Sequence, residues 1–322
     1  RYSVAEERLR LAVVGAGIMG SNHVRIGQNL RDASLVAVVD PDPDRARAAA
    51  GTSGVAVFET VEQVLGLVDA AVVAVPTAYH VDTALKLIEA GVHLLVEKPL
   101  AATAAAGREL VDAAETAGLV LAVGHVERFN PAVADLPIWV DQPIHVETVR
   151  TSPYTARISD GVVFDLLIHD IDIVCSLAGP DAVVEHVDGV SQTVRSTSED
   201  LVSVNLRFST GLTARLTASR LGQEKIRRIE VTQDDSVVIA DLLRQSITIQ
   251  RMSRHEFLSE QGMSYRQSSV VEIPFLETRG EPLALELQHF VDCVRSGEQS
   301  RVDGHAGARA VELAERIVDV VQ

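Results

Sequence analysis

Apolar residues in the first third of the chain fall in short continuous runs separated by stretches with helical periodicity. Continuous apolar runs of this length are typical of parallel strands that are buried on both faces. The five runs are Leu9–Val14, Leu35–Val39, Ala70–Val75, Val92–Val96 and Leu119–Val123. The segments 81–90 and 104–117 between them have the composition and end residues of helices. This alternation predicts a doubly wound, Rossmann-type sheet.

The pattern changes after Gly124. Four prolines between residues 126 and 160 indicate a crossover and loops, and a strongly apolar helix is expected over 161–177. Apolar and polar residues then alternate strictly along 202–208 and 212–219, on either side of a short turn. Such alternation predicts an antiparallel hairpin with one buried face.

The rest of the chain contains further strands and then helices. Strands are expected at 226–232, 237–241 and 247–251, and helices at 283–295 and 305–321. A chain of 322 residues exceeds what one hydrophobic core usually serves. The sequence therefore predicts an α/β protein with a Rossmann domain over 1–124 and a C-terminal α+β domain over 125–322.

Composition and charge narrow the classes of function. The formal net charge is −16, and an acidic chain repels nucleic acid, so that partner is disfavoured. No run of about 18 apolar residues occurs, so no membrane span is expected. The N-terminal segment lacks the apolar stretch of a secretory signal. Because Cys175 and Cys293 are far apart, they make no disulfide framework, and a cytoplasmic protein is expected.

Residues 15–20, Gly15-Ala16-Gly17-Ile18-Met19-Gly20, match the G-x-G-x-x-G pattern of dinucleotide-binding folds. They follow a predicted strand and open a predicted helix, which is the context the pattern requires. We expect Gly15 to form the tight turn, Gly17 to let the main chain approach a pyrophosphate, and Gly20 to let helix and strand pack. The helix N-terminus, at Ile18 and Met19, is expected to offer N–H groups to the phosphates.

Asp40 ends the second predicted strand, 20 residues beyond Gly20. A carboxylate at this position can accept hydrogen bonds from both ribose hydroxyls of the adenosine, and it repels a 2′-phosphate. The sequence therefore predicts NAD as the cofactor, in preference to NADP. The alternative is an ordinary turn at 15–20 with Asp40 as a surface acid.

Glu97-Lys98-Pro99 ends the predicted strand Val92–Val96. Ligands of open α/β sheets bind outside the carboxyl ends of the strands. A lysine there is well placed to meet a substrate hydroxyl beside a nicotinamide. The alternative role is a salt-bridged lysine at a strand end.

A stripe of polar residues interrupts the apolar helix expected at 161–177. At about 100° per residue, four side chains fall within about 60° of one another: Asp165, His169, Asp172 and Ser176. Asp170 points away from them. A buried carboxylate one turn from a histidine can orient the ring, hold its tautomer and stabilise the imidazolium.

Oxidation of a secondary alcohol by hydride transfer requires loss of the hydroxyl proton, and a histidine suits that role. We expect His169 to be the base, Asp165 its orienting partner and Lys98 the hydrogen-bond donor to the reacting oxygen, although either His169 or Lys98 could take the proton. The alternative for the helix is a buried ion pair that closes a domain interface. No metal is expected, because Asp170 lies off the stripe and nicotinamide oxidation needs no Lewis acid.

The chain resembles the glucose–fructose oxidoreductase / inositol dehydrogenase / rhizopine catabolism family over nearly its whole length. The shared motifs, in order, are the glycine loop, Val75-Pro76-Thr77 with His80, Glu97-Lys98-Pro99, Asp165-x-x-x-His169, and the stretch from Glu281 to Gly304. The resemblance implies a second domain with an open, predominantly antiparallel sheet, and oxidation of a pyranose or cyclitol at one carbon.

The resemblance also implies roles for particular residues. It makes Lys98, Asp165 and His169 the catalytic group, and it makes Pro99 a candidate for a cis peptide bond. The residues that it implies near the cofactor are Pro76, Thr77, His80 and Glu97.

A second set of motifs resembles a narrower branch of this family, which contains dehydrogenases that oxidise C3 of UDP-N-acetylglucosamine. The motifs are residues 124–131, 157–160 and 167–173. Arginine binds phosphate oxygens in a bidentate fork, so the cations offered to the diphosphate are Arg128, Arg157 and Arg220; salt bridges are their alternative role. His125 and Asn130 are expected to contact sugar or cofactor, and their alternative role is capping of the crossover. Asp172 is also expected to contact the substrate.

Two other functions remain open at this point. One is a free inositol or aldose dehydrogenase with the same chemistry, and the other is a catalytically silent, cofactor-sensing binding protein. The family resemblance also implies a homodimer or homotetramer that pairs through the polar face of the C-terminal sheet. The residues of that face are Ser203, Asn205, Arg207, Thr213, Arg215, Thr217 and Ser219.

Overall fold

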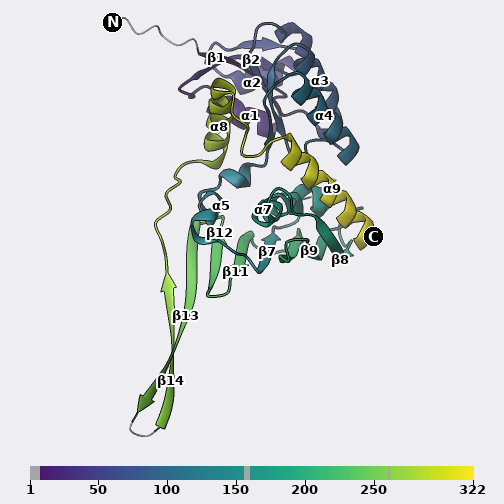
Figure 1. Ribbon diagram of the computed structural model, residues 1–322. Coiled ribbons are helices and arrows are strands. Elements are labelled where there is room, and N and C mark those ends of the chain that lie inside the picture. Colours follow the sequence, from purple (N-terminus) through teal and green to yellow (C-terminus); the bar gives the residue numbers. More distant parts are fainter. Residues whose placement is uncertain (1–7, 156–159, 260–261) are drawn as a thin grey trace, which may run out of the picture. The chain divides into compact units, whose positions relative to one another are not determined.

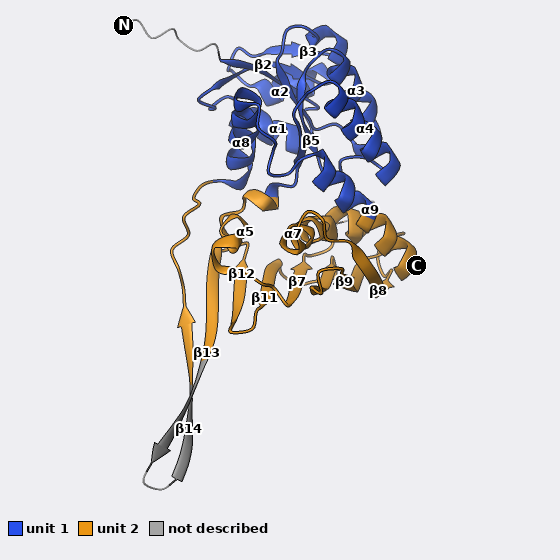
Figure 2. Ribbon diagram, in the orientation of Figure 1, with its two compact units in different colours: residues 1–126, 281–312 blue, residues 127–280, 313–322 orange. Residues whose placement is uncertain are grey.

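The computed structural model describes residues 8–155, 160–259 and 262–322, without the side chains of 253–267. The described chain divides into two compact units, coloured separately in Figure 2. Unit 1 contains residues 1–126 and 281–312, and unit 2 contains residues 127–280 and 313–322. The first crossing, after residue 126, lies close to the predicted boundary at 124. The return of 281–312 to unit 1 was not predicted.

Unit 1 is built on a six-stranded parallel sheet in the order β3-β2-β1-β4-β5-β6. Its strands are β1 (Leu9–Val14), β2 (Ala33–Val39), β3 (Ala56–Phe58), β4 (Ala70–Val73), β5 (His93–Glu97) and β6 (Leu121–Gly124). The five predicted strands are all present, and only β3 was missed, because three residues are too few to show a pattern. The order reverses between β1 and β4, which makes a topological switch point at the carboxyl edge of the sheet.

Helices cover both faces of this sheet, since successive residues of β1 from Leu11 to Val14 are all buried. α1 packs with α2 and α8, and α3 packs with α4 (Figure 1). The helices of unit 1 are α1 (Ile18–Gly27), α2 (Pro43–Ala50), α3 (His80–Glu89), α4 (Ala104–Thr116) and α8 (Pro282–Ser296), with 3₁₀ turns η1 (Val61–Val64) and η2 (Thr77–Tyr79). The last helix, α9 (Gly304–Val321), begins in unit 1 and continues into unit 2 after residue 312. None of the helices in the described ranges is long and apolar enough to cross a membrane.

α8 belongs to unit 1 because of its apolar stripe. Leu283, Leu287 and Phe290 are buried in the same core as Leu11 of β1 and Val24 of α1. Without α8 this part of the core would face water, so the Rossmann unit of this chain needs a segment from beyond residue 280.

Unit 2 contains an eight-stranded mixed sheet in the order β14-β13-β12-β11-β7-β10-β9-β8. Its strands are β7 (His145–Thr151), β8 (Val184–Gln192), β9 (Leu201–Phe208), β10 (Thr213–Ser219), β11 (Ile226–Thr232), β12 (Ser236–Asp241), β13 (Ser246–Ser259) and β14 (Gly262–Glu272). Among the described pairs only β7 with β10 is parallel. The β9–β10 hairpin and the predominantly antiparallel sheet confirm the prediction.

The expectation that 126–160 is only crossover and loop was wrong. The segment contains the 3₁₀ turn η3 (Val126–Phe129), the short helices α5 (Pro131–Ala134) and α6 (Leu136–Trp139), and the central strand β7. β7 alternates between buried and half-buried residues, but two of its buried residues are Thr148 and Arg150. Polar residues at inward positions hide the apolar alternation by which a strand is recognised.

The apolar helix also differs from the expectation. A π-helical turn, η4 (Val163–Leu167), precedes the α-helix α7 (Ile168–Ala178). Both elements contact β10 of the mixed sheet. A π turn is wider than an α turn, so the angle of 100° per residue does not hold across Asp165. π turns are frequent at functional sites.

Candidate functional site

The glycine loop between β1 and α1 has the geometry that a dinucleotide requires. Gly15 has a φ of 94°, and a Cβ there would lie 2.5 Å from the Ala74 carbonyl oxygen. A Cβ at Gly20 would lie 1.8 Å from the Gly15 oxygen, whereas one at Gly17 would meet nothing within 4 Å. Gly15 and Gly20 are therefore required by packing, and Gly17 leaves open space beside the N-terminus of α1. That terminus has no side-chain cap, so its N–H groups suit an anion.

Asp40 lies directly beside this loop. Its carboxylate is buried and accepts hydrogen bonds from the main-chain N–H groups of Ala16 (2.8 Å) and Asp42 (2.9 Å). The Arg45 guanidinium lies 3.3 Å from it. Asp40 thus joins the phosphate loop to the β2–α2 turn and places a negative charge where the adenosine ribose is expected. Contact with the ribose itself stays a prediction.

The end of β5 brings Glu97 and Lys98 to the carboxyl edge of the sheet. The Glu97 carboxylate is buried, and its Oε1 lies 2.7 Å from Nε2 of His23 on α1. The Lys98 N–H donates to Glu97 Oε2 at 3.2 Å. The Lys98–Pro99 peptide bond is cis, which confirms the prediction for Pro99. The side chain of Lys98 is half-buried.

His80 connects two loops at this edge. Its Nδ1 lies 2.9 Å from the Pro99 oxygen and its Nε2 lies 2.9 Å from the Val75 oxygen. The ring is buried, and this burial lowers the pKa of His80. η2, with Thr77 at its start and the exposed Pro76 before it, is thereby held beside the Lys98–Pro99 turn. The residues predicted near the cofactor in unit 1 do gather at one edge of the sheet.

In unit 2 the predicted catalytic pair lies on η4 and α7. Asp165 is on the π turn, with its carboxylate 3.7 Å from the Arg220 guanidinium, and His169 is in the first turn of α7. Arg220 is buried, lies 3.9 Å from the Asp200 carboxylate and donates to the Asp160 carbonyl oxygen. Arg220, expected at the diphosphate, is therefore engaged inside unit 2.

Two residues predicted to bind substrate are paired with each other. Arg128 of η3 donates to Asp172 of α7 through Nη1, at 3.3 Å from Oδ1. Asn130 is buried, accepts from Ala132 N–H as the N-cap of α5, and donates to the Leu242 oxygen. The capping role, left open by the sequence, is the one the structure shows for Asn130.

The remaining two predicted substrate-binding residues are His125 and Arg157. His125 is buried directly after β6. Arg157 lies outside the described residues.

A buried charge network in unit 2 was missed by sequence reasoning. Arg150 of β7 donates to both oxygens of Asp170 (3.0 and 2.8 Å) and to Glu127 (2.9 Å), and Arg227 donates to the same Glu127 oxygen at 2.9 Å. Burial lowers the pKa of Arg150, but the two carboxylates raise it more. The network ties η3 and the start of α7 to the sheet. Charged residues at inward positions of an alternating strand were the signal for it.

Unit 1 thus carries the glycine loop, Asp40 and Lys98 at one edge of its sheet. Unit 2 carries His169, with carboxylates and arginines, along η3, η4 and α7. A family profile described as "oxidoreductase family, NAD-binding Rossmann fold" matches residues 9–125. The profile of the "oxidoreductase family, C-terminal alpha/beta domain" matches residues 147–321.

Individual relatives resemble the chain over nearly its full length. UDP-N-acetylglucosamine 3-dehydrogenase of Acidithiobacillus ferrooxidans is 28% identical over 308 residues, which cover 95% of each chain. Scyllo-inositol 2-dehydrogenase (NAD⁺) of Bacillus subtilis is 30% identical over 316 residues, covering 91% of this chain and 88% of the relative. A solved structure of the Acidithiobacillus enzyme superposes with a TM-score of 0.86 at 27% identity, covering 98% of each chain.

Proposed function

This chain belongs to the glucose–fructose oxidoreductase / inositol dehydrogenase / rhizopine catabolism (Gfo/Idh/MocA) family. We propose that it oxidises C3 of UDP-N-acetylglucosamine with NAD as the hydride acceptor. Family membership makes it an NAD-dependent sugar dehydrogenase. The observation that carries the finer proposal is the similarity to a UDP-N-acetylglucosamine 3-dehydrogenase through both units, with 95% of each chain covered.

The residues of unit 1 fit NAD. The open space at Gly17 and the uncapped N-terminus of α1 suit a pyrophosphate. Asp40, held beside the loop by Ala16 N–H, would accept from the ribose hydroxyls. When bound, the nicotinamide of NAD supplies the acceptor for the hydride that leaves the sugar carbon.

The other steps of the oxidation would be carried out by side chains at the end of β5 and on η4 and α7. His169 would remove the hydroxyl proton, and Lys98 would donate a hydrogen bond to the reacting oxygen as it becomes a carbonyl. Asp165 would orient the imidazole, and Arg220, 3.7 Å from that carboxylate, would hold Asp165 in turn. The position of Lys98 at the end of β5, and those of Asp165 and His169 on η4 and α7, support these proposed roles.

Binding of the diphosphate of a UDP-sugar would require arginine side chains that donate to its oxygens. Arg128 already faces an anionic group, since its guanidinium lies 3.3 Å from the Asp172 carboxylate. Because carboxylate and phosphate oxygens both accept hydrogen bonds from the arginine fork, we propose that Arg128 binds the diphosphate of the substrate, with Arg157 as a second cation.

The test is NADH formation across a panel of UDP-sugars, free N-acetylglucosamine, inositols and aldoses. We expect the highest kcat/KM with UDP-N-acetylglucosamine. A higher value with an inositol would favour the second candidate, a cyclitol dehydrogenase like the Bacillus relative. NAD binding without turnover of any sugar would overturn the enzyme function and favour a cofactor-sensing protein.

A further inference from the structure

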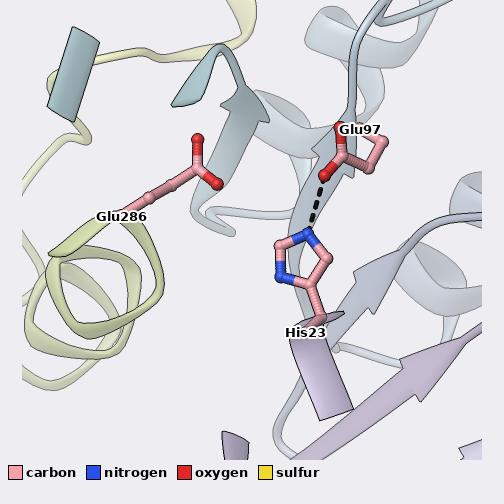
Figure 3. Close-up of side chains that lie close together, drawn as sticks. All are labelled: His23, Glu97 and Glu286. Carbon is pink, nitrogen blue, oxygen red and sulfur yellow. Dashed lines mark hydrogen bonds and ion pairs between the residues drawn. The ribbon is translucent and has the colours of Figure 1, made fainter. Parts of the chain in front are cut away.

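Unit 1 contains a buried cluster of three side chains, one of which is Glu97, the residue before Lys98. It consists of His23 on α1, Glu97 at the end of β5 and Glu286 on α8, and one nitrogen or oxygen atom of each lies within 4.8 Å of the others. Figure 3 shows the Glu286 side chain directed from α8 toward the His23–Glu97 pair. All three residues are buried.

Glu97 is the link between this cluster and the reacting lysine. One carboxylate oxygen lies 2.7 Å from His23 Nε2, and the other accepts from the Lys98 N–H at 3.2 Å. The neighbouring strand leaves room for this arrangement, because a Cβ at Gly124 would lie 2.9 Å from Glu97 Oε2. The orientation of the Glu97 carboxylate therefore fixes the main chain of Lys98.

Glu286 has an unusual environment for an acid. It is 2% exposed, and neither carboxyl oxygen has a hydrogen-bond partner among the described residues. Burial, together with the nearby charge of Glu97, raises the pKa of Glu286 well above its ordinary value. Two carboxylates this close in a buried site do not both ionise at moderate cost. Protonation removes the charge of Glu286 and gives it an O–H donor.

We propose that Glu286 is a neutral carboxylic acid in the folded enzyme, and that with His23 it positions Glu97 and, through Glu97, the main chain of Lys98. This inference rests on the proposed function, in which Lys98 contacts the reacting oxygen. Glu286 and His23 are positioning residues, since neither is part of the sheet edge that faces the ligands.

A divalent cation is the competing occupant of the cluster, because one histidine and two carboxylates are a common ligand set. The observed pairing opposes it. His23 Nε2 and Glu97 Oε1 are 2.7 Å apart, at hydrogen-bonding distance, and the other Glu97 oxygen is taken by Lys98 N–H. A cation bound through these atoms would have to replace the His23–Glu97 hydrogen bond, whereas a proton on Glu286 leaves it in place.

The experiment compares three variants of the full-length enzyme in NADH formation. Glu286→Gln keeps a neutral side chain of the same shape with N–H donors, and we expect its kcat to stay close to that of the wild type. Glu286→Met removes the O–H that a neutral Glu286 offers to the cluster, where His23 Nδ1 is the other buried atom without a partner in the described part of the chain. We expect kcat to fall about 10-fold in this variant, with the Kd of NAD unchanged.

Glu281→Gln is the matched control, since Glu281 precedes α8 and pairs with Arg25 of α1 at the exposed side of the same two helices. We expect it to leave kcat unchanged. Gly124→Ala reaches the Glu97–Lys98 contact from β6 without altering α8, so it should lower kcat as well. Thermal unfolding and NAD binding show that each variant is folded. Infrared spectra should show a carboxylic-acid carbonyl band that Glu286→Gln lacks.

The outcomes separate this inference from the proposed function. Glu286→Gln losing as much kcat as Glu286→Met, or a stoichiometric metal whose removal by chelator abolishes activity, would overturn the neutral acid. If Lys98→Met is inactive but Glu286→Met and Gly124→Ala keep the kcat of the wild type, the positioning role alone would be overturned. Near-normal kcat in Lys98→Met would overturn the proposed mechanism and the positioning role together, while the infrared band would still decide the protonation of Glu286.

Discussion

Replacing Arg150 by methionine should destabilise unit 2 more than any surface change. Methionine keeps most of the length and apolar volume of the side chain but removes the guanidinium. Three hydrogen bonds disappear, two to Asp170 and one to Glu127. Arg227 still reaches Glu127 at 2.9 Å, so the buried Asp170 carboxylate is the group left without its partner.

The expected loss of stability follows from the unpaired charge of Asp170. Breaking a buried ion pair by removing one partner costs about 3–5 kcal/mol in the free energy of unfolding. For a unit of about 150–250 residues, each kcal/mol shifts Tm by about 2–4 °C. We therefore expect Arg150→Met to lower the Tm of unit 2 by about 6–20 °C.

The measurement is calorimetry at pH 7 of Arg150→Met beside Arg228→Met. Arg228 lies on the adjacent strand β11 in an exposed pair with Glu230, and such pairs contribute about 0–1 kcal/mol. Adding Asp170→Asn to Arg150→Met should restore part of the loss, because it removes the unpaired charge. Equal losses in Arg150→Met and Arg228→Met would refute the reasoning.

The loss should also depend on pH. Burial raises the pKa of the Asp170 carboxyl, and Arg150 opposes that shift, so the variant raises the pKa further. An acid whose folded pKa lies above its unfolded value, about 3.9, binds protons preferentially in the folded state. The Tm difference between wild type and Arg150→Met should therefore shrink as the pH falls through the folded pKa. A difference that is constant with pH would contradict this.

Four further predictions follow from the sites. NAD should give a higher kcat/KM than NADP, and Asp40→Ala should narrow the gap; an equal or better value with NADP in the wild type would contradict the role of Asp40. Lys98→Met and His169→Asn should each lower kcat by about 10²-fold or more while NAD still binds, and His169→Asn should flatten the pH–rate profile between about pH 6 and 8, where histidine titrates. The pKa of Glu286 is raised in the folded state, so above about pH 4.5 the folded state keeps a proton that the unfolded state releases. The stability of the wild type should therefore fall with rising pH relative to that of Glu286→Gln. Parallel curves of Tm against pH for the two proteins would show that Glu286 does not titrate. Light scattering should give a particle larger than the 34.6 kDa chain, and a 34.6 kDa particle at micromolar concentration would exclude the homo-oligomer.

The Rossmann unit was predictable because its signals are local. Each buried strand is a continuous apolar run, and the glycines of residues 15–20 have tasks that depend only on the turn between β1 and α1. The acid at Asp40 and the lysine at Lys98 follow from positions at strand ends. Motifs of this kind are visible whenever a strand and the turn after it are contiguous in the sequence.

The parts that escaped prediction depend on groups brought together from distant positions. Arg150 made β7 look irregular, since its partner Asp170 is 20 residues away and nothing local marks the pair. The π turn at 163–167 shifts Asp165 relative to α7, and helical periodicity cannot anticipate an inserted residue.

Glu286 was also missed, although a signal existed. It shares the stripe of Leu283, Leu287 and Phe290 on α8, at spacings of three and four residues that put them on one face. An acid in an apolar stripe marks a buried group. Its partners on α1 and β5 could be identified only from the structure.

The return of α8 to unit 1 bears on how the protein is made. During synthesis the N-terminal part of a chain usually folds first. Here the core around Leu11 and Val24 stays open until residues 283–291 have left the ribosome, by which time the sheet of unit 2 has already been synthesised. The nascent Rossmann unit therefore exposes apolar surface during most of translation, a period in which chaperones would bind it. A gene fragment that stops at residue 126 should for the same reason yield an aggregating product rather than an isolated cofactor-binding domain.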